Sequence, residues 1–315
     1  MTAVVVTGAT GLIGSRIVKN LQSHDFNVVA TARLPTPEIG RELGVPVYVL
    51  DVLRPEESDL PDVADGILIH CATANDIVSK DAARGYELSV NGTWNVLQLA
   101  SSLGIKRAIY FSTFQVYGTE LVGVVDESFP TRCETPYGQN HWFGEEVCRL
   151  IATKQKMAIA VVRPSNVYGA PVASSVHRET LVPACFVRTA IINKEIVLHS
   201  SGRQLRNFVS TEEVADACIH LLHNFSPGFE IYNICSGYAA TMLELAQLTA
   251  EVYQEKFGVC LPVNILSDLP SDTNQFVARS RLESLWKSKN QSRNFMRQEI
   301  GALFDQMVRV LQSSN

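Results

Sequence analysis

Paired cysteines are missing from this sequence. The 315 residues include seven scattered cysteines, none of them in a Cys-x-x-Cys arrangement: Cys71, Cys133, Cys148, Cys185, Cys218, Cys235 and Cys260. An odd number of scattered cysteines argues against a disulfide framework and against a zinc ribbon. The pattern therefore predicts reduced thiols in a cytoplasmic protein that holds no metal.

Strong charge of one sign and long apolar runs are also absent. Lys and Arg total 27 against 32 Asp and Glu, with no basic tail or stripe, so nothing points to nucleic acid or an anionic membrane as a partner. No apolar run approaches the ~18 residues of a membrane span, and no charged segment precedes the first strand pattern. We expect a soluble protein without a leader, whose 46% hydrophobic residues bury a sizeable core.

Short apolar runs rich in β-branched residues alternate with helical patterns through the first half of the chain. The runs are AVVVT at 3–7, NVVAT at 27–31, VYVL at 47–50, ILIH at 67–70, RAIYFS at 107–112 and AIAVV at 158–162. Strands that are apolar on both faces lie inside a sheet covered by helices, and this alternation requires crossovers into a parallel sheet. The sequence predicts an α/β fold with a doubly wound parallel sheet of the Rossmann type.

The first strand runs into a glycine-rich turn. In VVVTGATGLIGSRIV, Gly8, Gly11 and Gly14 lie between a strand and a helix. Glycine there allows a tight turn and a close approach of the backbone to a pyrophosphate, while the helix N-terminus offers free N–H groups. A turn without a ligand is the alternative, but five further strands of the same kind favour a dinucleotide. The predicted contacts from this loop are Gly8, Thr10, Gly11, Leu12, Ile13 and Gly14.

The end of the second strand favours NADP. A fold that selects NAD usually places an acidic side chain there, against the ribose 2′-hydroxyl, and one that selects NADP places an arginine near the 2′-phosphate. In VVATARLP the acidic position is Thr31 or Ala32, and Arg33 follows at once. We expect NADP(H), with NAD as the alternative if Arg33 is a solvated loop residue. After the third strand, Asp51 and Val52 are expected beside the adenine, and a loop cap is the alternative for Asp51.

Helical patterns define the rest of the organisation. Apolar residues at three- and four-residue spacing predict crossover helices after Gly11, over 86–103 and over 137–154. Beyond residue 165 the alternation ends, and further helical patterns occur at 181–193, 211–223, 241–256 and 293–312. We predict a dinucleotide-binding domain and a smaller mixed α/β substrate-binding domain. The first comprises 1–165, with 205–235 returning to it, and the second comprises 166–204 and 236–315.

Eight segments resemble the extended short-chain dehydrogenase/reductase family of nucleotide-sugar epimerases, dehydratases and ketoreductases. They follow the family order over roughly the first 240 residues: TGATGLIG, HCATAN, VNGTWNVLQLA, FSTFQVYG, TPYGQNHWFGEE, VVRPSNVYG, RNFVSTEEVADA and YNICSG. The resemblance weakens beyond about residue 260. It implies an enzyme that uses a nicotinamide cofactor, takes a nucleoside-diphosphate sugar as substrate and forms a homodimer.

The resemblance also implies a catalytic pair. Tyr137 in YGQNH is similar to the family's acid/base tyrosine, and Thr113 in STFQVYG to the residue that hydrogen-bonds the same substrate oxygen. Four residues after the tyrosine the family carries a lysine, which lowers the tyrosine pKa and hydrogen-bonds the nicotinamide ribose; this chain has His141. An unperturbed imidazole is largely neutral at pH 7. We therefore expect His141 to hold the ribose and to activate Tyr137 weakly and in a pH-sensitive way. The opposing hypothesis is a site that binds the cofactor without turnover.

The remaining contacts are expected around this pair. The cofactor contacts are Cys71, Ala72, Thr73, Tyr137, His141, Pro164 and Val167. The substrate contacts are Thr113, Phe114, Gln115, Asn166 and Arg206. In the resembled family, the counterparts of Asn166 and Arg206 bind the substrate pyrophosphate, for which a planar guanidinium is suited. A second arginine that completes this contact in the family is not found in SDLPSDTNQF at 267–276.

Elimination within the resembled family narrows the reaction. The 4,6-dehydratases carry acid and base carboxylates just after the threonine, where this chain has Phe114 and Gln115, so dehydration is disfavoured. The epimerase-reductases carry a cysteine at the place of Gln115, which disfavours their bifunctional chemistry as well. We expect an NADP-dependent reductase of a keto group on a sugar nucleotide. A sugar-nucleotide epimerase with tightly bound NAD(P) is the alternative, and a non-catalytic dinucleotide-binding protein is the second.

Overall fold

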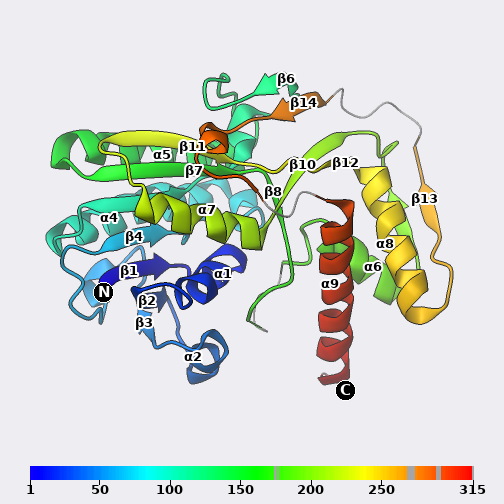
Figure 1. The fold of residues 1–315 in the computed structure, drawn as a ribbon, viewed down its shortest axis with the longest axis horizontal. Coiled ribbons are helices and arrows are strands. Elements are labelled where there is room, and N and C mark those ends of the chain that lie inside the picture. Colours follow the sequence, from blue (N-terminus) through cyan, green and yellow to red (C-terminus); the bar gives the residue numbers. More distant parts are fainter. Residues whose placement is uncertain (174–175, 177, 268–273, 289–291, 314–315) are drawn as a thin grey trace.

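A seven-stranded parallel sheet forms the larger part of the computed structural model, which describes residues 1–173, 176, 178–267, 274–288 and 292–313. Its strands are β1 (Thr2–Thr7), β2 (Phe26–Ala32), β3 (Val47–Val49), β4 (Ile67–His70), β5 (Arg107–Phe111), β7 (Ala158–Pro164) and β11 (Phe229–Ile234). They lie in the order β11-β7-β5-β4-β1-β2-β3 (Figure 1). The direction of winding changes between β1 and β4, and folds of this type bind ligands at the carboxyl ends of the strands on either side of such a change.

Helices cover both faces of this sheet, which explains why its strands are apolar throughout. The helices of this part are α1 (Leu12–Leu21), α2 (Pro37–Leu43), α3 (Ala82–Tyr86), α4 (Gly92–Ser102), α5 (Pro136–Gln155) and α7 (Thr211–His223). On one face α1 and α7 pack over alternate strand residues such as Val4 and Val6, and on the other α4 and α5 pack over the residues between, such as Val5. The predicted doubly wound α/β fold is confirmed.

A second group of elements lies to one side of the large sheet (Figure 1). It comprises β8 (Asn166–Tyr168), α6 (Ala184–Asn193), β9 (Ile196–Leu198), β10 (Leu205–Ser210), β12 (Ala239–Thr241), α8 (Met242–Phe257), β13 (Val263–Ile265) and α9 (Arg293–Ser313). Strand β10 pairs with β8 and β12, and β13 pairs with β9. Helices α6, α8 and α9 enclose a separate apolar core around Phe208 and Phe304. Two further strands, β6 (Val122–Val125) and β14 (Gln275–Ala278), pair with each other.

The structure differs from the sequence expectation in a few elements. All six expected strands are present, but β11 at the sheet edge is an additional one, because Glu230 interrupts its apolar pattern. The helix expected over 86–103 is divided by a π-helical turn at Glu87–Asn91, which joins α3 to α4. Helix α7 packs on α1 and β11 completes the large sheet, whereas β10 lies in the small one. The division into two domains stays a prediction.

Candidate active site

The glycine-rich turn brings three backbone segments into close contact. Gly8 has a φ of +65°, and a Cβ there would lie 3.0 Å from the backbone nitrogen of Ala72. A Cβ on Gly14 would lie 2.2 Å from the Gly8 carbonyl oxygen. Within the described residues, no side chain caps the start of α1 at Gly11, which leaves its first N–H groups for an anion. The turn therefore fits a dinucleotide pyrophosphate. The neighbouring residues expected at this contact are half-buried: Thr10, Leu12 and Ile13.

The carboxyl end of β2 carries no carboxylate. The buried Thr31 hydroxyl donates to the Val6 carbonyl oxygen at 3.3 Å, so it is already used within the sheet. Ala32 is buried and Arg33 is exposed at the point where the strand ends. A guanidinium, and no acidic group, is thus placed next to the position where the ribose hydroxyls of a dinucleotide lie in such folds.

Asp51 caps its own loop, which was the alternative to a contact with adenine. Its Oδ1 accepts a hydrogen bond from the Leu53 N–H at 3.0 Å, and its Oδ2 pairs with Arg54 at 3.4 Å. The next residue, Val52, is buried, and a Cβ on Gly92 of α4 would lie 2.8 Å from its Cγ2. Contact of Asp51 and Val52 with adenine stays a prediction.

A buried hydrogen-bond chain fixes the segment that follows β4. His70 Nδ1 lies 2.6 Å from the Thr7 hydroxyl, and its Nε2 lies 3.2 Å from the Thr93 hydroxyl on α4. Burial lowers the pKa of His70 to about 3, so the ring is neutral at pH 7. The same Thr7 oxygen accepts from the backbone N–H groups of Cys71 and Ala72 at 3.2 and 3.3 Å. Both residues are thereby held at the carboxyl edge of β1 and β4.

Tyr137 and Thr113 meet where α5 begins, beside the end of β5. The Thr135 hydroxyl accepts from the Gly138 N–H at 3.0 Å, a side-chain cap that fixes the first turn of α5 and hence the position of Tyr137. The Thr113 hydroxyl accepts from the Gln115 N–H at 3.2 Å, and it lies near enough to the Tyr137 phenol to lower the pKa of that phenol. The structure thus brings the two expected catalytic residues together.

The environment of Tyr137 includes two charged residues that the sequence did not single out. Burial raises the pKa of Tyr137; the positive charge of Arg178 and the Thr113 hydrogen bond oppose the rise, and the negative charge of Asp76 adds to it. The phenol is therefore protonated at pH 7. Arg178 and Asp76 belong to no motif and lie in irregular loops, so no sequence signal identified them.

His141 differs from the expectation in its charge. Its Nδ1 lies 2.9 Å from the Tyr137 carbonyl oxygen, which can only accept, so Nδ1 carries the hydrogen; Nε2 then accepts from the Thr73 hydroxyl at 3.2 Å. Burial lowers the pKa of His141 to about 4, and the ring is neutral at pH 7. The expected pH-sensitive activation of Tyr137 near neutral pH is therefore wrong. A contact of His141 with the nicotinamide ribose stays a prediction.

Phe114 and Gln115 lie on opposite sides of the turn that follows Thr113. Phe114 is buried, with its ring stacked on Phe276 at 6.0 Å and edge-on to Tyr117 at 4.9 Å between centroids. This packing leaves Phe114 little surface for a substrate. Gln115 is exposed and remains accessible to one.

The two residues expected at the substrate pyrophosphate lie on adjacent strands of the small sheet. The Asn166 side-chain amide on β8 donates to the Asn207 carbonyl oxygen on β10 at 2.8 Å. Arg206 precedes Asn207 on β10 and lies opposite Ala240 of β12. Their role in binding a substrate stays a prediction.

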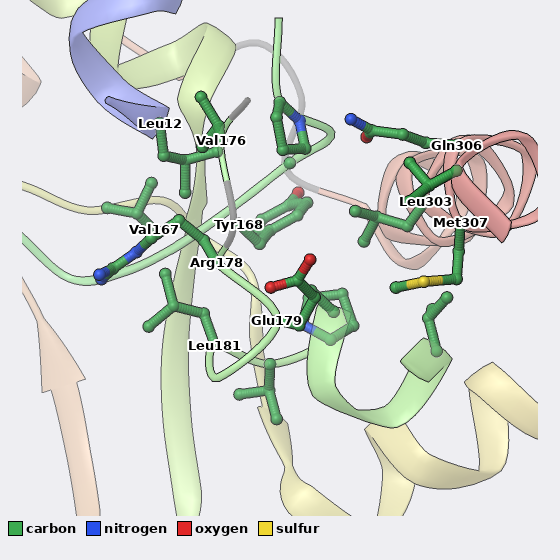
Figure 2. A pocket seen from close by; sticks show the side chains of 17 residues that line it. Leu12, Val167, Tyr168, Val176, Arg178, Glu179, Leu181, Leu303, Gln306 and Met307 are labelled. Atoms are coloured by element: carbon green, nitrogen blue, oxygen red, sulfur yellow. The ribbon is translucent and has the colours of Figure 1, made fainter. Parts of the chain in front are cut away.

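A pocket lies beside β8, between the loop that precedes α6 and the helix α9 (Figure 2). Leu12 at the start of α1 and Val167 on β8, both expected at the cofactor, line it together with Arg178. Leu303 and Met307 close its far side from α9. Pro164, the remaining expected cofactor contact, is buried at the end of β7.

Fold and site together define a short-chain dehydrogenase/reductase of the extended type. Residues 4–235 match the NAD dependent epimerase/dehydratase family, and the chain belongs to this family. It is an enzyme of the group that comprises nucleotide-sugar epimerases, dehydratases and reductases.

Two curated relatives and one solved structure illustrate the range of this group. The chain is 28% identical to the dTDP-D-glucose 4,6-dehydratase of Mus musculus over 305 residues, which cover 91% of this chain and 84% of that protein. It is 26% identical to a dTDP-4-dehydro-6-deoxy-D-allose reductase of Streptomyces sp over 266 residues, 79% of this chain and 80% of the relative. The structure of UDP-glucuronic acid 4-epimerase from Bacillus cereus in complex with NAD shares the fold, with a TM-score of 0.81, 20% identity, and 98% and 97% of the two chains covered.

Two features are absent from the described residues. Within that part of the chain, no helix combines the length and the apolar composition needed to cross a membrane. Across the same residues, no group of three or more His, Cys, Asp or Glu side chains is arranged to hold a metal ion.

Proposed function

We propose that this enzyme reduces a keto group on a nucleoside-diphosphate sugar with NADPH. The observation that carries the proposal is the end of β2, where Ala32 and the exposed Arg33 replace the acidic residue of an NAD site. An enzyme that draws reducing equivalents from exchangeable NADPH acts as a net reductase. The relative that reduces a dTDP-4-dehydro-6-deoxy sugar supports this direction.

The protonation state of Tyr137 supports reduction as well. Reduction of a carbonyl needs a proton donor at the oxygen, and a buried phenol whose pKa is raised is protonated at pH 7. Tyr137 gives its proton to the carbonyl oxygen, while the Thr113 hydroxyl donates a hydrogen bond to the same oxygen and orients it. The nicotinamide, when bound, supplies the hydride to the carbon. Neutral His141 positions the Tyr137 backbone through its Nδ1–H bond.

A nucleotide sugar as substrate is supported by the polar residues on the small sheet. Asn166 on β8 and Arg206 on β10 lie on neighbouring strands, where an amide and a guanidinium together suit a pyrophosphate. Solved relatives with this fold bind UDP-glucose or UDP-glucuronic acid. The cytoplasm is the proposed compartment, since all seven cysteines are free thiols.

Dinucleotide selectivity tests the proposal. We expect purified protein to release no stoichiometric NAD on denaturation and to bind NADPH more tightly than NADH. Arg33→Gln is expected to weaken NADPH binding by about 10- to 100-fold, the value of a charge-assisted hydrogen bond to phosphate, and to leave NADH binding unchanged. Isothermal titration measures both dissociation constants.

Arg41→Gln is the matched control for this test. Arg41 is also an exposed arginine, but it lies on α2 and pairs with Glu38 at 2.7 Å, so its loss should not change the affinity for either dinucleotide. Equal binding of NADPH and NADH by the wild type, or equal loss in both arginine variants, would refute NADP selectivity.

A sugar-nucleotide epimerase with retained NAD is the second candidate. Solved relatives of the same fold hold NAD and carry epimerase names, and a tyrosine–threonine pair can serve oxidation and re-reduction at one carbon. Stoichiometric NAD released from the denatured protein would favour this candidate over the reductase.

A further inference from the structure

Arg178 and Asp76 form an ion pair between two loops at the carboxyl edge of the sheet. Arg178 Nη2 lies 2.9 Å from Asp76 Oδ1, and the Thr180 hydroxyl donates to Asp76 Oδ2 at 3.2 Å. Asp76 follows β4, whereas Arg178 and Thr180 precede α6. The Arg178 side chain is 19% exposed, so solvent screens its charge only in part.

This ion pair lies beside the catalytic tyrosine. Three residues before Asp76, the Thr73 hydroxyl bonds His141 Nε2 at 3.2 Å, and the His141 ring lies 4.3 Å from the Tyr137 ring between centroids. Both Asp76 and Arg178 are close enough to Tyr137 to interact with the phenol electrostatically. The loop after β4 therefore connects the ion pair to Tyr137.

One guanidinium nitrogen of Arg178 is left without an acceptor. Nη1 is buried and has no hydrogen-bond partner in the described part of the chain, an arrangement that costs free energy unless an acceptor arrives. Figure 2 shows the side chain extending past Val167, an expected cofactor contact that lines the same pocket. The nitrogen is thus available to an acceptor that enters this pocket beside Val167.

No other cation replaces this one among the described residues around Tyr137. The titratable and charged groups that face Tyr137 are Arg178, Asp76, His141 and Tyr110. Burial keeps His141 neutral, and burial also raises the pKa of Tyr110 well above its usual value. Asp76 carries the opposite sign. Among the described residues, Arg178 therefore supplies the positive charge that acts on the phenol.

We propose that Arg178 takes over the electrostatic role of the lysine that the resembled family carries four residues after its tyrosine. Its guanidinium stabilises the Tyr137 phenolate that remains when the phenol has given its proton to the substrate oxygen. Asp76 and Thr180 hold Arg178 in place for this role. Arg178 acts through Tyr137 and is therefore a positioning residue. The proposal rests on the proposed carbonyl reduction, in which Tyr137 is the proton donor.

The ionisation of Tyr137 in the unliganded protein tests this directly. Protein labelled with 13C at tyrosine Cζ is titrated by NMR, and the Tyr137 resonance is the one that disappears in Tyr137→Phe. Arg178→Gln is expected to shift the pKa of Tyr137 upward, because the phenolate loses the positive charge of Arg178. Arg178→Lys keeps the positive charge, so the pKa of Tyr137 in this variant is expected to stay close to its wild-type value. Should Arg178→Gln fail to fold, Arg178→Met, of similar length and without charge, is the test.

Arg107→Gln is the matched control. It removes the same charge at the amino end of β5, the opposite edge of the sheet from Tyr137. A pKa of Tyr137 that shifts no more in Arg178→Gln than in Arg107→Gln overturns the proposal. An equal shift of the pKa of Tyr137 in Arg178→Lys and Arg178→Gln also overturns it, since the effect would then be structural and not due to charge.

The measurement also separates this inference from the proposed function. If the pKa of Tyr137 depends on Arg178 but the protein binds no dinucleotide, the role of Arg178 stands and the proposed reductase function is refuted. If the protein reduces a keto-sugar nucleotide but the pKa of Tyr137 does not depend on Arg178, the reductase function stands and the role of Arg178 is refuted.

Discussion

An imidazole stands in this site where other members of the family carry a lysine. His141 occupies the position of a lysine, yet it is neutral, because burial lowers its pKa to about 4 and both ring nitrogens are occupied by Tyr137 and Thr73. A lysine at this place combines two tasks, binding the ribose and charging the tyrosine. In our proposal two residues divide these tasks: His141 binds the ribose, and Arg178 supplies the positive charge.

The depressed pKa of His141 has a consequence for stability. The folded-state pKa of about 4 lies below the unfolded value of 6.5, so on acidification the unfolded chain binds a proton that the native ring refuses. The contribution of neutral His141 to the free energy of unfolding is therefore fully present above pH 6.5. It is lost progressively as the pH drops from 6.5 towards 4. Between pH 7.5 and pH 5, we expect the free energy of unfolding of His141→Gln to fall by about 2 kcal/mol less than that of the wild type. Urea unfolding at the two pH values measures this difference.

His199→Gln serves as the control for this measurement. His199 is exposed on the loop after β9, so its removal should leave the loss of stability on acidification as it is in the wild type. If His141→Gln and the wild type lose equal stability on acidification, His141 is not held neutral by burial.

At the scale of elements, the packing of α1 against the glycine-rich turn is the most constrained part of the site. A Cβ on Gly14 would lie 2.2 Å from the Gly8 carbonyl oxygen and 2.9 Å from the Gly8 carbonyl carbon, both rigid backbone atoms. The helix must move away from the turn to accept a side chain. Its free N–H groups would then no longer point at a pyrophosphate held by the turn.

Gly14→Ala is therefore expected to weaken both folding and cofactor binding. Overpacking of this kind costs about 1–3 kcal/mol of stability, and we expect dinucleotide affinity to fall at least tenfold as α1 shifts. Chemical denaturation and fluorescence titration with NADPH measure the two effects.

The matched change is Gly301→Ala in the middle of α9. There the Cβ would meet only Lys256 Cε, at 3.5 Å, an ordinary contact. Because alanine is the better helix former, this variant should gain up to about 1 kcal/mol and bind NADPH unchanged. A Gly14→Ala protein as stable and as tightly binding as Gly301→Ala would contradict the close-packing argument.

At the scale of the whole molecule, α3, α4 and α5 carry exposed apolar side chains on the face that does not pack on the sheet. These residues are Tyr86, Trp94, Phe143 and Leu150. The Tyr86 and Phe143 rings lie edge to face at 5.8 Å between centroids, and grouped apolar exposure marks association surfaces in otherwise well-packed proteins. It supports the homodimer that the family resemblance implies, with α4 and α5 at the interface.

Leu150→Glu is expected to shift the protein from dimer to monomer, because a dimer would have to bury the new carboxylate. Analytical ultracentrifugation measures the oligomeric state. Leu311→Glu on α9 is the control, since both leucines are 40% exposed on helices and the substitution is the same. A wild type that sediments as a monomer, or a dimer that only Leu311→Glu disrupts, would contradict the assignment of this face.

Much of the fold follows from local patterns that the tertiary structure did not need to correct. The runs at 3–7, 27–31 and 67–70 are apolar without interruption, and such runs form central strands wherever helices cover both faces. Element ends were less predictable. The π-helical turn at Glu87–Asn91 depends on packing between α4, α5 and the loops near them. No residue type in this segment predicts it.

By itself, the sequence determined the glycine-rich turn and the arginine at the end of β2, because each depends on residues at short, fixed spacing around one strand end. The pairing of Thr113 with Tyr137 was implied by the family resemblance. Tertiary structure alone decided the charges around Tyr137. The pKa of His141 depends on burial, and the positive charge comes from Arg178, held by Asp76 of another loop. Solvent exclusion and contacts between distant loops leave no periodic trace in a sequence, which is why the histidine was expected to carry a role that the arginine is placed to fill.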